Sequence, residues 1–275
     1  MKNYWRLVRG HPRPARFLLA RLLMATRTCQ FLSIRQAGYR LRFHPSNISS
    51  QLWIDPGQRS ADLQFLSDYL QPGDSVVDVG ANIGETVLTS AIRVGTEGHV
   101  LGIEPHPRTF RFLEDNVRLN HVANVHLINR AVGAASGVVT FSDDRRDDMN
   151  RVGGGDLQVP MERLDALVPE PGPIALLKVD VEGYERFVFE GAPQVLARTA
   201  CVFFEVSGPH FATFGYRTRV VIELLLASGF RLFRVAGPRT LRAIPRDFDT
   251  DAFENLVALR DADEGRRRTG WTVES

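Results

Sequence analysis

Hydrophobic residues form two kinds of pattern that follow one another along this sequence. Short apolar runs at residues 75–79, 100–103 and 125–128 are typical of strands that are buried on both faces. In the intervals between these runs, apolar residues recur every three or four positions over about residues 84–93 and 107–119, which predicts two amphipathic helices. Strands that alternate with helices in this way predict a mostly parallel sheet with helices on both faces.

The alternation continues through the second half of the chain. Apolar runs at residues 174–180, 200–206, 230–235 and 255–259 predict four further strands, with helical stretches between most of them. Together with the first three runs they indicate a doubly wound α/β fold around a seven-stranded sheet. A shorter run at residues 138–141 predicts an extra strand outside this main series.

This pattern divides the chain into four segments. The α/β domain occupies residues 75–260, and residues 46–74 form a lead-in region with one helix predicted at residues 61–70. Residues 1–45 are a basic extension ahead of this region. Residues 261–275 are charged and uneven, so we expect a frayed tail.

The composition is that of an ordinary folded protein. Hydrophobic residues make up 44% and charged residues 24% of the chain, which excludes a largely disordered protein and one with many membrane-spanning helices. The two cysteines, Cys29 and Cys201, are far apart and have no CxxC spacing, so we expect no zinc site. Such cysteines fit a reducing compartment, and we expect a cytoplasmic protein.

Charge is distributed unevenly along the chain. Residues 1–42 contain ten Lys or Arg and no acidic residue, whereas the remainder contains 24 basic and 32 acidic residues. The apolar stretch at residues 17–24 is too short, and too interrupted by Arg21, to span a bilayer. The basic segment is an extension packed on the core, a surface for anionic membranes or partners, or an organellar targeting peptide. We expect it to promote peripheral membrane contact, and we expect the core to fold without it.

The turn after the first strand of the domain has features of a cofactor site. Residues 78–84 read DVGANIG, and the candidate binding residues are Asp78, Gly80, Asn82 and Gly84. Glycine lets the backbone approach a ligand closely, but this turn lacks the full GxGxxG spacing. A carboxylate at the strand end repels a pyrophosphate and attracts the cationic amine and sulfonium of S-adenosylmethionine. The alternative is that Asp78 only caps the turn.

A second acid, Glu104, ends the second strand and is followed by Pro105. At this position of a doubly wound sheet, a carboxylate can accept hydrogen bonds from both hydroxyls of an adenosine ribose. NAD enzymes also use an acid there. Glu104 therefore indicates a ribose site without distinguishing NAD(P) from S-adenosylmethionine.

The candidate catalytic residues lie at or just after the ends of the fourth and fifth strands. They are Asp180, Glu182, Glu205 and His210, which we expect on one edge because ligands collect at the carboxyl ends of parallel strands. Methyl transfer to an alcohol needs positioning and a nearby base, and Asp180 is the first candidate for that base. The alternative is that Asp180 only pairs with Lys178. No Asp-Asn pair follows the fifth strand, so we expect no required metal.

Three stretches of the domain resemble the FkbM family of methyltransferases. They are residues 78–84, residues 103–105 with the sequence IEP, and above all residues 177–185 with the sequence LKVDVEGYE. The resemblance covers about residues 41–260. It implies a class I methyltransferase fold, usually with the seventh strand antiparallel, and methyl transfer from S-adenosylmethionine to a hydroxyl of a sugar, lipid-linked or secondary-metabolite acceptor.

The sequence also bears on other functions and on a lid over the site. The fourth strand is not followed by Asn/Asp-Pro-Pro-Tyr and the core is net acidic, so we expect no nucleic-acid acceptor. An NAD(P)-dependent oxidoreductase and a non-catalytic S-adenosylmethionine-binding module remain as alternatives. Residues 142–156, rich in aspartate and glycine, are either a mobile lid over the acceptor pocket or a hairpin tip without a role.

Overall fold

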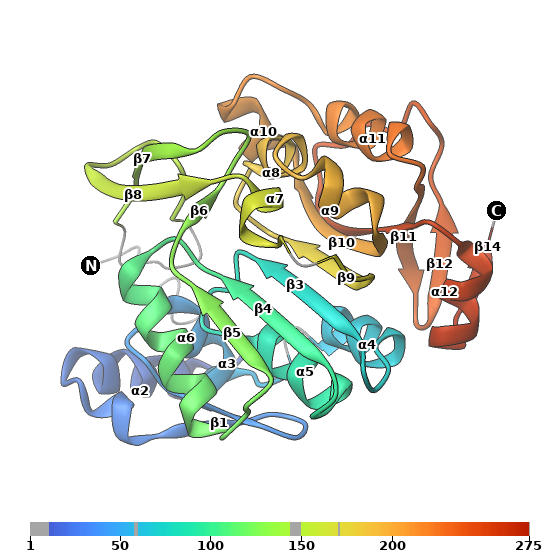
Figure 1. The fold of residues 1–275 in the computed structure, drawn as a ribbon. Helices are drawn as coiled ribbons and strands as arrows, with labels where there is room; N and C mark the ends of the chain where they lie inside the picture. The colour runs from blue at the N-terminus through green and yellow to red at the C-terminus, as the bar shows by residue number, and fades with distance from the viewer. Residues whose placement is uncertain (1–10, 58–59, 144–149, 170, 275) are drawn as a thin grey trace.

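The centre of the computed structural model is one nine-stranded sheet (Figure 1). The structure describes residues 11–57, 60–143, 150–169 and 171–274. In spatial order, the strands are β14 (Thr272–Glu274), β12 (Thr240–Ala243), β11 (Arg231–Gly237), β13 (Phe253–Leu259), β10 (Thr199–Ser207), β9 (Ile174–Val179), β3 (Ser75–Val79), β4 (His99–Ile103) and β5 (Val125–Ile128).

The sheet has the predicted doubly wound topology. Strands β5, β4, β3, β9 and β10 are parallel, and β13 is antiparallel to both of its neighbours, β10 and β11. The strand order reverses between β3 and β9, because the chain first builds outward from β3 to β5 and then returns to β9. The predicted seven-stranded sheet with an antiparallel seventh strand is confirmed, and β12 and β14 extend it beyond the prediction.

Helices cover both faces of this sheet. Side chains alternate along β3, so that Val76 packs in one hydrophobic core while Val77 and Val79 pack in the other. The helices in the Val76 core are α4 (Ser60–Tyr69), α5 (Glu85–Val94), α6 (Pro107–Leu119) and α12 (Ala262–Thr269). Those in the Val77 core are α7 (Leu164–Leu167), α8 (Glu185–Glu190), α9 (Pro193–Ala197), α10 (Gly208–Thr213) and α11 (Thr218–Ala227).

The described part of the basic N-terminal segment is a structured layer outside α5 and α6. Its elements are α2 (Pro14–Ala25), the 3₁₀-helix η1 (Thr28–Phe31), β1 (Ser33–Arg35) and β2 (Arg40–Arg42), followed by α3 (Asn47–Ile54). The buried side chains of Ile34, Tyr39 and Leu41 pack with Ile83 and Leu88 of the domain. The segment therefore shares a hydrophobic core with the domain, and folding of the domain without residues 1–42 stays a prediction.

A small second sheet is separate from the main sheet. It consists of β6 (Ala131–Val132), β8 (Leu157–Glu162) and β7 (Gly137–Phe141), in that order, around buried Ala131, Phe141 and Val159. β7 confirms the predicted extra strand, whereas β8 was not predicted. Residues 144–149, which make up much of the expected lid, lie outside the described residues.

The C-terminal segment is ordered structure, so the expectation of a frayed tail is wrong. Helix α12 packs against α4, and β14 pairs in parallel with β12 at the edge of the main sheet. Trp271 is buried, and its indole N–H donates a 2.9 Å hydrogen bond to Asp68 of α4. The Arg268 guanidinium lies 2.7 Å from the Asp74 carboxylate. One aromatic anchor and one partly buried ion pair therefore attach a charged segment that resembles a tail in sequence.

Candidate functional site

A cavity of about 600 Å³ opens at the carboxyl ends of β3, β4, β9 and β10. It lies where the strand order reverses, which is the usual ligand position in open α/β sheets, and its volume is within the range of about 300–1,000 Å³ typical of small-molecule sites. The sequence-predicted residues that line it are Gly80, Asn82, Glu104, Pro105, Asp180, Glu182 and Glu205. The structure thus brings most of the candidate cofactor and catalytic residues to one cavity.

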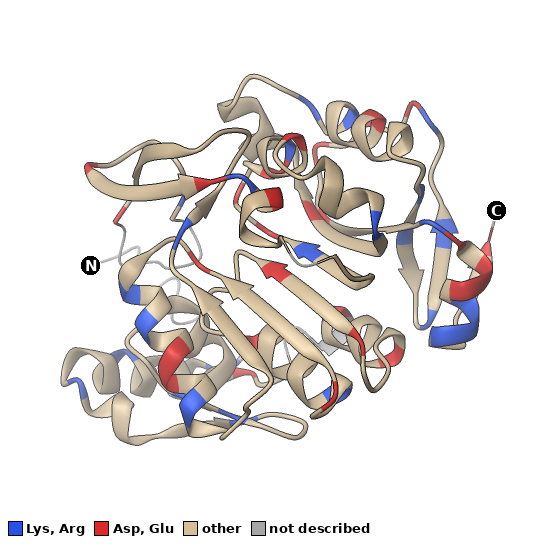
Figure 2. Cartoon of the chain, in the orientation of Figure 1, with Lys and Arg blue, Asp and Glu red and all other residues tan. Residues whose placement is uncertain are grey.

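Asp78 lies behind the cavity wall, where its charge is matched. In the sheet register, Asp78 of β3 stands directly beside Lys178 of β9, and the Lys178 ammonium lies 3.2 Å from the Asp78 carboxylate. Figure 2 shows acidic and basic positions next to each other on the central strands β3 and β9. The Thr86 hydroxyl donates a hydrogen bond to the other Asp78 oxygen. Asp78 is therefore a buried structural ion-pair partner rather than a side chain that faces the cavity.

The two glycines of the turn are required by close protein packing. Gly80 has φ of 83°, and a Cβ atom there would lie 1.8 Å from the Asp180 carbonyl oxygen. Gly84 has φ of 94° at the start of α5, and a Cβ atom there would lie 2.6 Å from the Leu113 side chain. Any side chain at Gly80 would separate the turn after β3 from the turn after β9.

The Asn82 backbone N–H is hydrogen-bonded to the Glu104 side chain. The Asn82 N–H donates a 2.9 Å hydrogen bond to Glu104 Oε2, and the His106 N–H donates a 2.9 Å hydrogen bond to Glu104 Oε1. Asn82 has φ of 47°, a left-handed conformation that asparagine tolerates better than most residues. A carboxylate has about four acceptor positions, so Glu104 can be held in this way and also accept ribose hydroxyls.

Asp180 lines the cavity and also contacts Lys178. The Lys178 ammonium lies 3.4 Å from the Asp180 carboxylate and donates a 2.9 Å hydrogen bond to the Gly80 carbonyl oxygen. Both sequence interpretations of Asp180 therefore have a structural basis, because the residue pairs with Lys178 and still reaches the cavity. Its side chain is 17% exposed, which leaves one edge open to a ligand.

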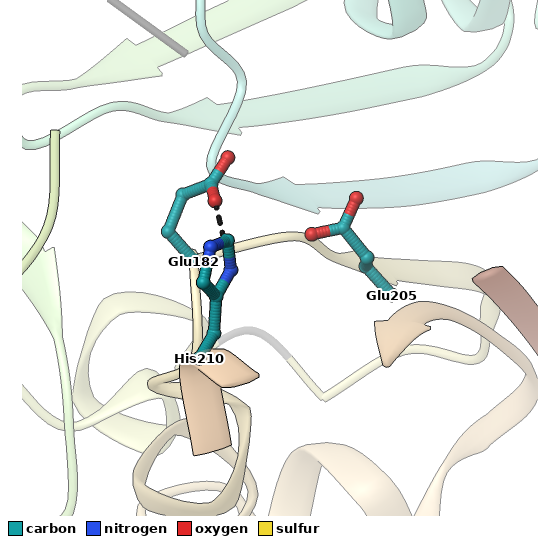
Figure 3. Close-up of side chains that lie close together, drawn as sticks. All are labelled: Glu182, Glu205 and His210. Atoms are coloured by element: carbon teal, nitrogen blue, oxygen red, sulfur yellow. Dashed lines mark ion pairs between the residues drawn. The ribbon is translucent and has the colours of Figure 1, made fainter. Parts of the chain in front are cut away.

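Glu182, Glu205 and His210 form a cluster next to Asp180 (Figure 3). His210 Nδ1 lies 3.2 Å from Glu182 Oε2, and the Glu205 carboxyl group points toward these two side chains. Burial raises the pKa of Glu205 well above its usual value, and the nearby carboxylates of Asp180 and Glu182 raise it further. Burial also lowers the pKa of His210, so its imidazole favours the neutral form. His210 reaches the site through Glu182 rather than as part of the cavity wall.

Sequence reasoning missed the residues that hold the turn after β9. The buried Glu185 carboxylate accepts hydrogen bonds from the N–H groups of Val181 and Gly183, at 3.0 and 3.4 Å. The Tyr216 hydroxyl donates a 2.6 Å hydrogen bond to the Gly183 carbonyl oxygen. Glu185 belongs to the LKVDVEGYE motif, so the motif contained the signal, whereas Tyr216 comes from a distant segment with no local signal.

Residues far from the motifs also line the cavity. Ile48, Gln51 and Asp62 come from the lead-in region, and Arg130 precedes the small second sheet. Their place depends on long-range packing, which hydrophobic periodicity does not encode. The described ionisable residues of the cavity wall are Asp62, Glu85, Glu104, Asp180, Glu182, Glu205 and Glu254 on the acidic side, with Arg130 and Lys178 on the basic side.

The topology and the acidic cavity define an α/β protein of the class I methyltransferase type. Residues 78–232 match the model of the methyltransferase FkbM domain. The chain therefore belongs to the FkbM family of S-adenosylmethionine-dependent methyltransferases, which confirms the resemblance of its motifs.

Several known proteins are similar to this chain. The hexuronic acid methyltransferase AglP of Haloferax volcanii is 27% identical over 180 residues, covering 62% of this chain and 72% of AglP. A protein-L-isoaspartate O-methyltransferase of Caenorhabditis elegans is 28% identical over 133 residues, covering 48% of this chain and 59% of that protein. The chain spans only 50–59% of the length of three such isoaspartate methyltransferases. The precorrin-6y C5,15-methyltransferase structure from Geobacter metallireducens aligns with 11% identity and a TM-score of 0.45, covering 74% of this chain and 89% of its own.

In the described part of the chain, no helix is both long enough and apolar enough to cross a membrane. Helix α2 nevertheless carries exposed apolar side chains, with Leu19 46% and Leu22 60% exposed. Phe31 of the adjoining 3₁₀-helix is 79% exposed. Arg21 and Arg27 are exposed in the same segment, and no acidic residue lies on α2 (Figure 2).

Proposed function

We propose that this protein transfers the methyl group of S-adenosylmethionine to a hydroxyl oxygen of a small-molecule, glycan or lipid-linked acceptor. The observation that carries the proposal is the excess of carboxylates over cationic side chains around a cavity at the carboxyl ends of β3, β4, β9 and β10. Such a cavity attracts the amine and sulfonium of S-adenosylmethionine and disfavours the pyrophosphate of NAD(P). The charge that supports this choice comes from the cavity carboxylates, not from Asp78.

The donor half of the cavity is the part nearest β3 and β4. Asn82 and Glu104 are held together there by a backbone hydrogen bond, and Pro105 follows on the same wall. In this proposal, Glu104 accepts the ribose hydroxyls, and Gly80 keeps the turn close to β9. The methyl group then faces the carboxyl ends of β9 and β10.

The acceptor half supplies a base. An acceptor hydroxyl oxygen attacks the methyl carbon in line with the sulfonium, a C–O bond forms, and the C–S bond breaks with its electron pair on sulfur. The products are the methyl ether and neutral S-adenosylhomocysteine. The hydroxyl proton goes to Asp180, which lies on the cavity wall within 3.4 Å of the Lys178 ammonium.

The acceptor class is supported by the family and by one relative. AglP is named as a hexuronic acid methyltransferase, and it is similar over more of this chain than the isoaspartate methyltransferase is. We therefore place an oxygen-rich acceptor, such as a sugar, ahead of a peptide carboxyl group. A contact with anionic lipid through the exposed leucines and arginines of α2 would bring a lipid-linked sugar near the protein.

Calorimetry with purified protein tests the donor, and mass spectrometry tests the product. We expect saturable binding of S-adenosylmethionine and S-adenosylhomocysteine and no binding of NAD or NADP. Metabolite and lipid extracts from cells with and without the protein should differ by species that are one CH₂ heavier when the protein is present. Binding of NAD in place of S-adenosylmethionine would contradict the methyltransferase proposal. Donor binding without any methylated product would favour the non-catalytic alternative.

A further inference from the structure

Glu182, Glu205 and His210 have the arrangement of ligands around a metal ion (Figure 3). Each side chain offers one atom of a metal-ligating type, and the three atoms lie within 4.8 Å of one another. They come from three elements, because Glu182 follows β9, Glu205 lies in β10 and His210 lies in α10. The turn that contains Glu182 follows β9 directly and α10 follows β10 directly, so the main sheet positions all three side chains.

Two atoms of this cluster are buried without a hydrogen bond. Among the described residues, Glu205 Oε2 and His210 Nδ1 have no hydrogen-bond partner, although Nδ1 lies within ion-pair distance of Glu182. The Glu205 residue is only 5% exposed. Leaving such polar atoms unsatisfied in the interior is unfavourable. A cation between the side chains would bind both atoms at once.

The distance between His210 and Glu182 fits two neighbouring ligands of one ion. Ligand atoms at about 2.1 Å from a metal are separated from each other by about 3 Å in ordinary coordination geometries. The measured separation of His210 Nδ1 and Glu182 Oε2 is 3.2 Å. The Glu205 carboxyl group points toward these two side chains and would complete a set of three (Figure 3).

We propose that these three side chains bind a divalent cation at the acceptor end of the cavity. Two carboxylates and one imidazole favour a transition-metal ion such as Mn²⁺ over Mg²⁺ or Ca²⁺, which prefer oxygen ligands alone. Three protein ligands leave coordination positions open. This proposal replaces the sequence-based expectation that no metal is required.

A cation at this place defines the acceptor more narrowly, and this step rests on the proposed methyl transfer. An acceptor with two adjacent oxygens, such as a vicinal diol or a hydroxy acid of a sugar, can occupy two open positions. The cation then lowers the pKa of the bound hydroxyl, and the hydroxyl proton still leaves to a protein carboxylate. The cation also neutralises the acidic wall, so that an acidic sugar is not repelled.

Metal binding is measured on the full chain after removal of metal with EDTA. Calorimetric titration with MnCl₂ should give one site per chain, with a smaller affinity for MgCl₂. Glu205→Gln and His210→Ala should each lower the Mn²⁺ affinity at least tenfold. Matched controls are Glu223→Gln, an exposed carboxylate paired with Arg219, and His99→Ala, an exposed histidine on β4; both should bind Mn²⁺ like the wild type.

A measurement without variants guards against loss of folding. During a titration, Mn²⁺ should broaden the NMR signals of residues around Glu182, Glu205 and His210 at a lower Mn²⁺ concentration than the signals around His99. The proposal is overturned by the absence of a saturable Mn²⁺ site, by unchanged affinity in folded variants, or by broadening elsewhere. Binding of S-adenosylmethionine by the metal-free protein is followed in parallel. Its loss contradicts the proposed function alone, whereas its retention without any Mn²⁺ site contradicts the metal site alone.

Discussion

Lys178 connects the two halves of the site with a single ammonium group. It lies 3.2 Å from the Asp78 carboxylate, 3.4 Å from the Asp180 carboxylate and 2.9 Å from the Gly80 carbonyl oxygen. One cation therefore holds the donor turn and the first candidate base together. Two carboxylates therefore share this one cation.

Replacing Asp180 with asparagine separates the chemical role of the residue from its structural role. Asparagine keeps the shape but is not a base, so turnover should fall by roughly 10²–10⁴-fold while donor affinity changes little. Steady-state kinetics and donor calorimetry measure the two effects. Asp263→Asn, at a 75% exposed side chain on α12, is the matched control.

A thermal melt must accompany these kinetics. If Asp180 acts only as a partner of Lys178, the variant loses stability, and activity falls only in proportion to the folded fraction. A stable Asp180→Asn protein with wild-type turnover would contradict the assignment of Asp180 as the base.

Glu104 gives a prediction for the donor. Glu104→Ala should lose about 1.5–3 kcal/mol of S-adenosylmethionine affinity, since charged hydrogen bonds to the ribose are removed. Glu104 also accepts the N–H groups of Asn82 and His106, so the alanine variant disturbs the turn as well. Glu104→Gln retains one acceptor and should lose less affinity. Calorimetry that finds wild-type affinity in a folded Glu104→Ala protein contradicts the ribose role.

Glu185 gives a prediction for the pH dependence of stability. Burial raises its pKa from 4.5 to about 7 in the folded protein. The folded state therefore retains a proton that the unfolded chain releases, and stability falls as pH rises from about 4.5 through 7. Glu185→Gln removes this titration. Between pH 4.5 and pH 8, the free energy of unfolding of the wild type should therefore fall by on the order of 2–3 kcal/mol more than that of Glu185→Gln.

Denaturant unfolding at both pH values measures this difference, with Glu190→Gln on α8 as the control. Parallel pH profiles of wild type and Glu185→Gln would mean that the carboxyl group is ionised in the folded protein.

The site was only partly predictable from single residues. Strand ends placed Glu104, Asp180 and Glu205 correctly, because a parallel sheet brings its carboxyl ends to one edge. Asp78 was placed at the cavity on the same argument, yet its carboxylate is covered by its contacts with Lys178 and Thr86. The partner that a strand-end side chain meets depends on register, and register depends on the neighbouring strand.

At the scale of elements, α12 and β14 form an ordered segment that the hydrophobic pattern of the sequence did not predict. The helix has a low apolar content and many arginines, and its sequence therefore resembles a solvated tail. Its attachment comes from Trp271, which packs edge-on against Phe65 with ring centroids 5.4 Å apart. A single long-range aromatic contact leaves no periodicity to detect.

Trp271 is therefore predicted to stabilise the whole fold. Trp271→Ala should lower the free energy of unfolding by about 3 kcal/mol, because it leaves a cavity beside Phe65 and removes the hydrogen bond to Asp68. Arg266→Ala, at a 63% exposed side chain of α12, should have little effect. Urea unfolding measures both. Equal stability of Trp271→Ala and wild type would mean that the segment is detached in solution.

At the scale of the whole molecule, the seven strands of the doubly wound sheet were predictable and the extensions of that sheet were not. Alternating strands and helices with right-handed connections restrict the topology strongly, so seven strands and two helical layers followed from the sequence. The N-terminal layer carries no such alternation. It attaches through buried side chains such as Leu41 and through long-range hydrogen bonds, such as the one of 2.7 Å that the Arg42 N–H donates to the Asn116 side chain. Only the folded structure reveals these contacts.

The exposed leucines and arginines of the N-terminal layer predict lipid binding by the whole protein. We expect the protein to sediment with vesicles that contain phosphatidylserine, more weakly at high salt and with neutral vesicles. A variant with Leu19→Ser, Leu22→Ser and Phe31→Ser should sediment less, because it removes exposed apolar surface and retains the buried core.

Val138→Ser is the control for this variant, since Val138 is 66% exposed on the second sheet. Equal sedimentation of the wild type and the triple variant contradicts a role for this surface.

The contact between Gly80 and the Asp180 carbonyl oxygen has a consequence for redesign of the enzyme. Since no side chain fits between the two turns, donor and acceptor positions at this edge cannot be altered separately. New acceptor preferences are better sought in cavity residues outside the turns, such as Arg130 before the second sheet and Phe253 at the start of β13. A library restricted to such positions varies the shape of the pocket while the catalytic frame stays constant.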